Sequence, residues 1–82
     1  MHEVGIASGI LDAVRQETAA HKPARATKVG IRIGAMAGVD PASLAFCFEA
    51  LVKDTDLEPL ELAIEPGDAG ELEFAFLELE QP

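Results

Sequence analysis

The stretch from residue 28 to 65 constrains the fold most strongly, because two strand patterns in it flank one helix pattern. "KVGIRIGAM" and "LELAIEP" alternate apolar and other residues with period two, as half-buried strands do. Between them, "AGVDPASLAFCFEALVK" has helical spacing and offers Asp40 as N-cap and Pro41 for the first helical position. A strand–helix–strand unit of this kind predicts two parallel strands joined by a right-handed crossover.

The flanking segments predict one more helix and one more strand. Residues from about 6 to 21 have an amphipathic helical pattern, which ends because Pro23 disfavours helical geometry at Lys22. "PGDAG" is a turn signal, and "ELEFAFLELE" predicts a strand after it. The apolar face of that strand is expected to carry Leu72, Phe74 and Phe76. Beyond Phe76 the pattern changes phase, which a bulge or a second buried surface would explain.

The predicted order is therefore helix, strand, helix, strand, strand. We expect an α/β (α+β) fold: a two-layer sandwich in which two helices cover one face of a three-stranded mixed sheet. The last strand is expected to run antiparallel, since it returns through a short turn. Residues 1–82 are expected to form a single domain.

Composition excludes several classes of function. The chain has 15 acidic and 6 basic residues, a net charge of −9, and neither Trp nor Tyr. Such a surface repels phosphate backbones and lacks base-stacking rings, so we expect no nucleic-acid partner. No apolar run approaches the ~20 residues of a membrane span, and no signal peptide is visible, so we expect a cytoplasmic protein without a membrane segment.

The first three residues, "MHE", form a candidate metal-ligand set. The Met1 α-amine and the His2 amide nitrogen can close one chelate ring, and His2 Nδ1 can close a second ring with a backbone nitrogen. The fourth donor is either the Glu3 amide nitrogen or a Glu3 carboxylate oxygen. Planar nitrogen donors suit Ni(II) or Cu(II). By itself the tripeptide is weak, because a terminal His is usually unstructured and Glu3 also suits the start of a helix.

The remaining candidates have plainer explanations. His21 fits a cation at the carboxyl end of a helix, and Cys47 fits a small apolar residue packed between Phe46 and Phe48. The single cysteine also excludes an internal disulfide. We find no Ser–His–Asp set, carboxylate pair or phosphate loop, and therefore expect no catalytic residues and no enzyme activity.

Several motifs in one order resemble the HypA family of hydrogenase nickel-incorporation proteins. They are "MHE", "GILDAV", "KVGIRIG" and "AGVDPASLAFCFEAL", and the similarity covers about residues 1–65 and resumes from 71 to 80. The resemblance implies a nickel metallochaperone in which His2 is the principal Ni(II) ligand and Met1 and Glu3 complete the site. It also implies two partners, the hydrogenase-maturation GTPase, docked on the neighbouring helix surface, and the precursor of the hydrogenase large subunit.

The chain departs from that family at one place. The family carries a zinc domain with two CxxC pairs between its last two strands, whereas a short turn near residues 66–70 stands there and no CxxC exists. We therefore expect no structural zinc. Recognition of the large-subunit precursor is in doubt where it depends on the absent zinc domain. We expect the last two strands to be adjacent, so that loss of the zinc domain leaves the nickel domain intact. The short connection between them favours a homodimer or strand-swapped dimer. The alternative is a metal-free acidic interaction module that docks a GTPase or self-associates.

Overall fold

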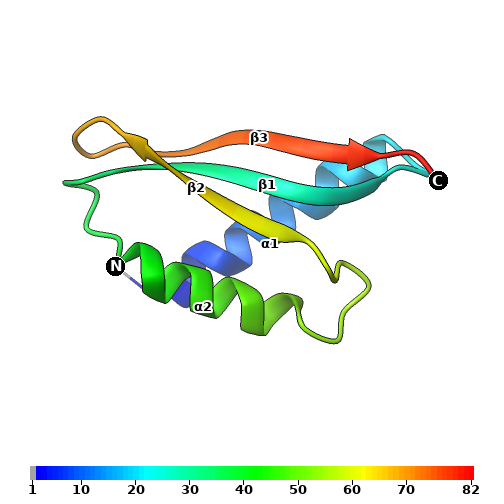
Figure 1. Cartoon of the computed structure of the whole chain (residues 1–82), viewed down its shortest axis with the longest axis horizontal. Coiled ribbons are helices and arrows are strands. Elements are labelled where there is room, and N and C mark those ends of the chain that lie inside the picture. The colour runs from blue at the N-terminus through cyan, green and yellow to red at the C-terminus, as the bar shows by residue number, and fades with distance from the viewer. Residues whose placement is uncertain (1) are drawn as a thin grey trace.

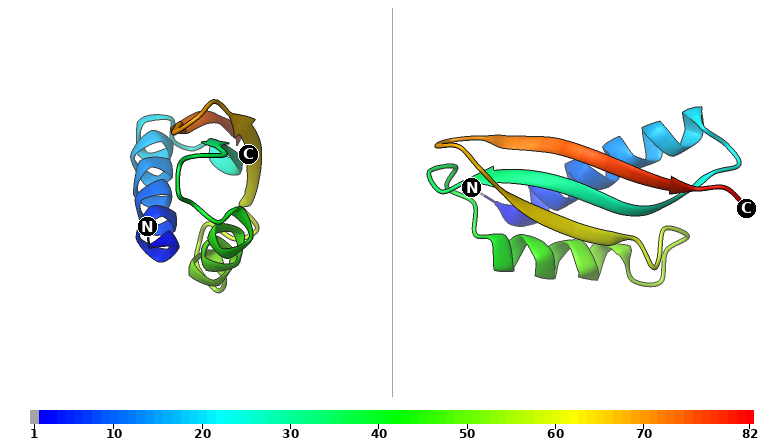
Figure 2. Two further views of the ribbon diagram at one scale, coloured as in Figure 1. Left: turned by 90° about the vertical axis from the view of Figure 1, so that its left-hand side faces the viewer. Right: turned by 45° about the horizontal axis from the view of Figure 1, so that its top comes forward.

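Five elements follow one another in the computed structural model, which describes residues 2–82. They are α1 (Glu3–Ala20), β1 (Arg25–Gly34), α2 (Pro41–Val52), β2 (Glu61–Gly67) and β3 (Leu72–Glu80). Both helices lie on the same face of the sheet (Figures 1 and 2). The predicted order and two-layer α+β architecture are thus confirmed, although α1 begins at Glu3, earlier than its amphipathic pattern indicates.

The sheet has three strands in the order β2-β1-β3. β1 pairs in parallel with β2 and antiparallel with β3, so the predicted mixed sheet and the parallel crossover are confirmed. The inward-facing residues of β1 are almost fully buried and form one core cluster with residues of both helices. The core residues are Ala7, Ile10, Val14, Val29, Ile31, Ile33, Leu44, Phe48, Val52 and Leu60.

α2 begins where its sequence signals indicate. Asp40 is the N-cap, and its Oδ1 accepts hydrogen bonds from the backbone N–H groups of Ala42, at 3.0 Å, and Ser43, at 3.4 Å. Pro41 occupies the first helical turn, where its missing N–H costs no hydrogen bond. The cap therefore fixes the entry to α2 independently of the core.

The last two strands are not neighbours, which corrects our expectation. β1 lies between β2 and β3, and the connection from Asp68 to Glu71 crosses the end of β1. There the Gly34 N–H donates to the Glu71 carbonyl at 2.8 Å, and the Met36 N–H donates to the Ala69 carbonyl at 2.8 Å. The reason is burial: apolar β1 takes the centre, where both edges are paired, and the glutamate-rich strands take the sheet edges, where charge discourages aggregation.

The phase change in β3 lies before Phe76, not after it. Phe74 is opposite Ile31 and Phe76 is opposite Gly30, so Ala75 forms a bulge between them. Leu72 and Phe74 face the helices as predicted, but Phe76 lies on the outer face of the sheet, against Gly30. A side chain on Gly30 would overlap the Phe76 ring, so the glycine makes room for it. The apolar run in β3 is compatible with Phe76 on either face of the sheet. The space left by Gly30 on the outer face favours that face.

Candidate metal centre

His2 is the N-cap residue of α1 and its side chain is exposed. Its backbone is extended, with φ −89° and ψ 109°, and the imidazole makes no capping hydrogen bond. The His2 carbonyl instead accepts the N–H groups of Gly5, at 3.1 Å, and Ile6, at 3.2 Å. The ring is therefore at the surface while its backbone is held by the first turn of the helix. Met1, the other predicted terminal ligand, lies outside the described residues.

The start of a helix also supplies backbone nitrogens. The first N–H groups of an α-helix have no acceptor within the helix, because the chain has no carbonyl one turn earlier. The amides of His2 and Glu3 occupy this position at the start of α1. Either can lose its proton to a metal ion without breaking a hydrogen bond of the helix.

The Glu3 carboxylate reaches across to the start of α2. Its Oε2 accepts the backbone N–H of Asp40 at 3.1 Å, and this hydrogen bond lowers the pKa of Glu3 below its ordinary value. The pKa of Asp40 is also lowered, mainly because its Oδ2 accepts the Ser43 hydroxyl at 3.0 Å. The Glu3 carboxylate thus connects the amino ends of both helices, which lie beside each other (Figure 1). Sequence reasoning missed this contact between residues 37 positions apart.

The other sequence candidates do not join this centre. His21 lies at the opposite end of α1, about 27 Å away along a helix of 18 residues. Its Nδ1 is 2.8 Å from the Glu17 carbonyl, so its plainer role as a helix-end residue fits. Cys47 is half-buried and packs against the core. Within residues 2–82 no three His, Cys, Asp or Glu side chains come together in a metal-binding group.

No helix in the described part of the chain has the length and apolar composition needed to cross a membrane.

Comparison with known proteins points to one family. A family model described as hydrogenase/urease nickel incorporation, metallochaperone, hypA, matches residues 1–70. Hydrogenase maturation factor HypA of Chlorobium phaeobacteroides (strain BS1) is 43% identical over 74 residues, which are 89% of this chain and 66% of that protein. The factor of the same name from Psychromonas ingrahamii is 35% identical over 79% of this chain and 57% of its own length. The one from Escherichia coli (strain K12) is 35% identical over 84% of this chain and 60% of its own length. The chain spans about three fifths of the length of such relatives.

Proposed function

The chain belongs to the HypA family of hydrogenase and urease nickel-incorporation metallochaperones, and on that premise we propose that it binds Ni(II) at its amino terminus and delivers it during [NiFe]-hydrogenase maturation. The observation that carries this proposal is the family match over residues 1–70, which includes Met1, His2 and Glu3. The protein acts as a carrier in the cytoplasm and catalyses no reaction of its own.

The proposed ligands are the Met1 α-amine, the His2 amide nitrogen and the His2 imidazole. Two observations support this set: the imidazole is exposed, and the adjacent amides belong to the first turn of α1. We assign the fourth donor to the Glu3 amide nitrogen, because the Glu3 carboxylate already accepts the Asp40 N–H. A plane of nitrogen donors matches the geometry that Ni(II) prefers.

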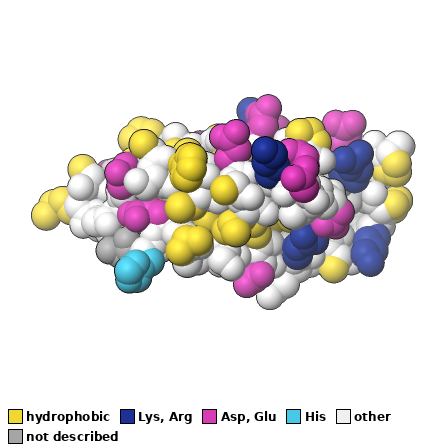
Figure 3. Space-filling model, turned by 90° about the horizontal axis from the view of Figure 1, so that it is seen from below, with side chains coloured by type: hydrophobic (Ala, Val, Ile, Leu, Met, Phe, Trp, Pro, Cys, Tyr) yellow, Lys and Arg dark blue, Asp and Glu magenta, His cyan; other side chains and the backbone are white. Residues whose placement is uncertain are grey.

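For delivery we propose docking of the hydrogenase-maturation GTPase on the helix layer beside the metal centre. Large apolar side chains are exposed there, Val4 by 55% on α1 and Phe46 by 74% on α2. Figure 3 shows hydrophobic side chains gathered on the face that is seen from the side of α2. The hydrogenase large-subunit precursor is the proposed recipient of the ion.

We propose that residues 1–82 act as one nickel domain, with a turn near residues 66–70 in place of the family's zinc domain. The sequence holds a single cysteine, Cys47, and hence no CxxC pair for a structural zinc. A homodimer formed by strand exchange would have to open the connection from Asp68 to Glu71, whose carbonyls accept hydrogen bonds from the N–H groups of Gly34 and Met36 at the end of β1.

Calorimetric titration of the tag-free chain with Ni(II) tests the proposal. We expect about one ion per chain and binding that weakens as the pH falls, because protons compete for the nitrogen donors. Absorption spectroscopy of the nickel-loaded chain should show a weak d–d band, and the ion should not be paramagnetic, as expected for planar Ni(II). His2→Ala should abolish this binding, while His21→Ala, the matched control, should retain it. Equal affinity in His2→Ala and the parent chain would place the site elsewhere.

The second candidate function is a metal-free module that docks the GTPase or a second copy. The net charge of −9 together with exposed Phe46 favours it. Affinity for the purified GTPase, measured by surface plasmon resonance with chelator present, separates the two functions. Binding that survives both chelator and His2→Ala supports the module, whereas binding that requires Ni(II) supports the metallochaperone.

A further inference from the structure

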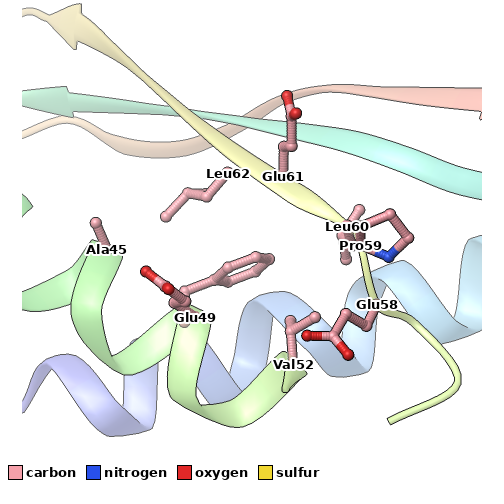
Figure 4. A pocket seen from close by; sticks show the side chains of 9 residues that line it. Ala45, Glu49, Val52, Glu58, Pro59, Leu60, Glu61 and Leu62 are labelled. Carbon is pink, nitrogen blue, oxygen red and sulfur yellow. The ribbon is translucent and has the colours of Figure 1, made fainter. Parts of the chain in front are cut away.

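A groove of about 410 Å³ lies between the second half of α2 and the start of β2. Its floor is apolar, with Phe48, Val52 and Leu60 nearly buried and Leu62 half-buried. Leu62 extends from β2 toward α2, whereas Glu61 points away from the helix (Figure 4). The groove therefore offers an apolar floor to side chains that enter from the open side of β2.

β2 is an edge strand of the described sheet. It pairs with β1 along Glu61 to Gly67, and no strand of residues 2–82 pairs with its other side. An edge strand presents main-chain N–H and C=O groups that an extended peptide can satisfy by adding a strand. The groove and this edge are contiguous, because Leu60, Glu61 and Leu62 line the groove.

The charge of the groove has one sign. The charged side chains at the groove are those of Glu49 and Glu58, since the Glu61 carboxylate points away to the outer face, and none of the nine lining residues is Lys, Arg or His. On the outer face of β2, Glu61 and Glu65 are only partly neutralised, by Lys28 at 3.8 Å and Arg32 at 3.5 Å. Complementary potential favours a cationic partner and disfavours an anionic one.

We propose that the groove and the free edge of β2 together bind an extended, positively charged segment of a partner protein. The segment adds a fourth strand beside β2. Its side chains alternate between the two faces of the sheet, so every second residue packs toward Leu62 and α2 and is apolar. The intervening residues lie on the face of Glu61 and Glu65, where lysine or arginine forms opposite-charge cross-strand pairs. This site is separate from the metal centre, which lies at the other end of α2, and it needs no nickel.

The test uses a synthetic peptide of about six residues in which lysine and valine alternate, acetylated and amidated at its ends. It is titrated into the nitrogen-15-labelled, metal-free chain and followed by NMR. We expect the chemical-shift changes to concentrate on the amides of β2 and the second half of α2. The β2 amides whose N–H groups face outward should become protected from hydrogen exchange.

Two charge reversals of the same sign provide the matched comparison. Glu49→Lys lies in the groove, and Asp12→Lys lies on exposed α1. We expect Glu49→Lys to lower the affinity for the peptide by about fivefold or more, because it removes an opposite charge from the groove. Asp12→Lys should lower this affinity by less than about twofold, because salt screens a charge that lies far from the peptide. Both positions are exposed, so circular dichroism should show an unchanged fold.

Three results would overturn the proposal. One is equal weakening by the two substitutions, which would mean that the peptide senses net charge alone. Another is unchanged affinity when alternate backbone nitrogens of the peptide are methylated, which would exclude strand pairing. The third is equal affinity for a peptide with glutamate in place of lysine. None of these measurements uses Ni(II), so the peptide-binding proposal can fail while the proposed nickel function holds, and the reverse.

Discussion

Gly30 and Phe76 show how one residue without a side chain sets the register of a strand. The Phe76 ring occupies the space on the outer face of the sheet where a Gly30 side chain would be. The bulge at Ala75 brings the ring to that position and turns Leu77 and Leu79 toward the helices. Gly9 on α1 has no such constraint, since a methyl group added there would meet nothing within 4 Å.

The same substitution at these two glycines should therefore have opposite effects on stability. Gly30→Ala should lower the free energy of unfolding by about 1–3 kcal/mol, because it overpacks the contact with Phe76. Gly9→Ala should raise it by up to about 1 kcal/mol through helix propensity. Denaturant unfolding followed by circular dichroism measures both. In a Phe76→Ala background the Gly30→Ala effect should shrink, and an undiminished effect there would contradict the proposed clash.

Glu3 provides a second residue-scale prediction, for the proposed nickel site. If the fourth nickel donor is the Glu3 amide nitrogen, Glu3→Gln keeps that donor and also keeps an oxygen to accept the Asp40 N–H. The Ni(II) affinity measured by calorimetry should then stay within about threefold of the parent value, less than about 1 kcal/mol. A loss comparable to that of His2→Ala would assign the fourth position to the carboxylate.

At the scale of elements, the amino ends of α1 and α2 are joined by the Glu3 carboxylate. Glu3 lies in the first turn of α1 and Asp40 caps α2, so both carboxylates meet the positive ends of helix dipoles. The Asp40 N–H donated to Glu3 lies immediately before α2 and has no acceptor within that helix. The Glu3 side chain of α1 thus satisfies the Asp40 N–H at the start of α2 and holds the two helices together beside the proposed nickel site.

Acid should weaken this junction. The folded-state pKa of Glu3 lies below its unfolded value, so its contribution to stability is present at neutral pH and is lost as the pH falls through the folded value. Glu3→Gln should therefore be less stable than the parent at pH 7 and should approach it between about pH 5 and pH 2. Glu49→Gln, at an exposed position of α2, is the control. A Glu3→Gln deficit that is independent of pH would show that charge does not stabilise the junction.

At the scale of the whole molecule, the arrangement of strands separates apolar from charged surface. β1 lies in the centre and buries Val29, Ile31 and Ile33, while both edge strands carry glutamates toward solvent. On the face shown in Figure 3, the Lys and Arg side chains lie toward the end that holds the C-terminus in Figure 1. The remaining negative charge repels itself and favours the approach of cations.

Salt should consequently stabilise the fold. Raising ionic strength from 0.01 M to 0.1 M shortens the Debye length from about 30 Å to about 10 Å, which screens the self-repulsion of a chain with net charge −9. We expect the Tm to rise over this range. The double variant Asp12→Lys, Glu49→Lys reduces the net charge to −5, because each substitution adds two positive units, and its Tm should depend less on salt. An equal salt dependence in both proteins would argue against self-repulsion.

Local patterns in the sequence were sufficient for the type, order and approximate bounds of the elements. The Asp40–Pro41 pair marks the start of α2, period-two alternation marks β1, and the crossover makes β1 and β2 parallel. These features could be predicted because each depends on residues close along the chain or on the handedness of the backbone. The family motifs likewise pointed to the amino terminus without any structure. Three features depended on contacts between residues far apart in sequence: the central position of β1, the bulge that places Phe76 over Gly30, and the hydrogen bond from Asp40 to Glu3. Periodicity specifies which face of an element is apolar. Only packing in three dimensions decides which element that face contacts and which partner the unpaired backbone groups at the ends of the element bind.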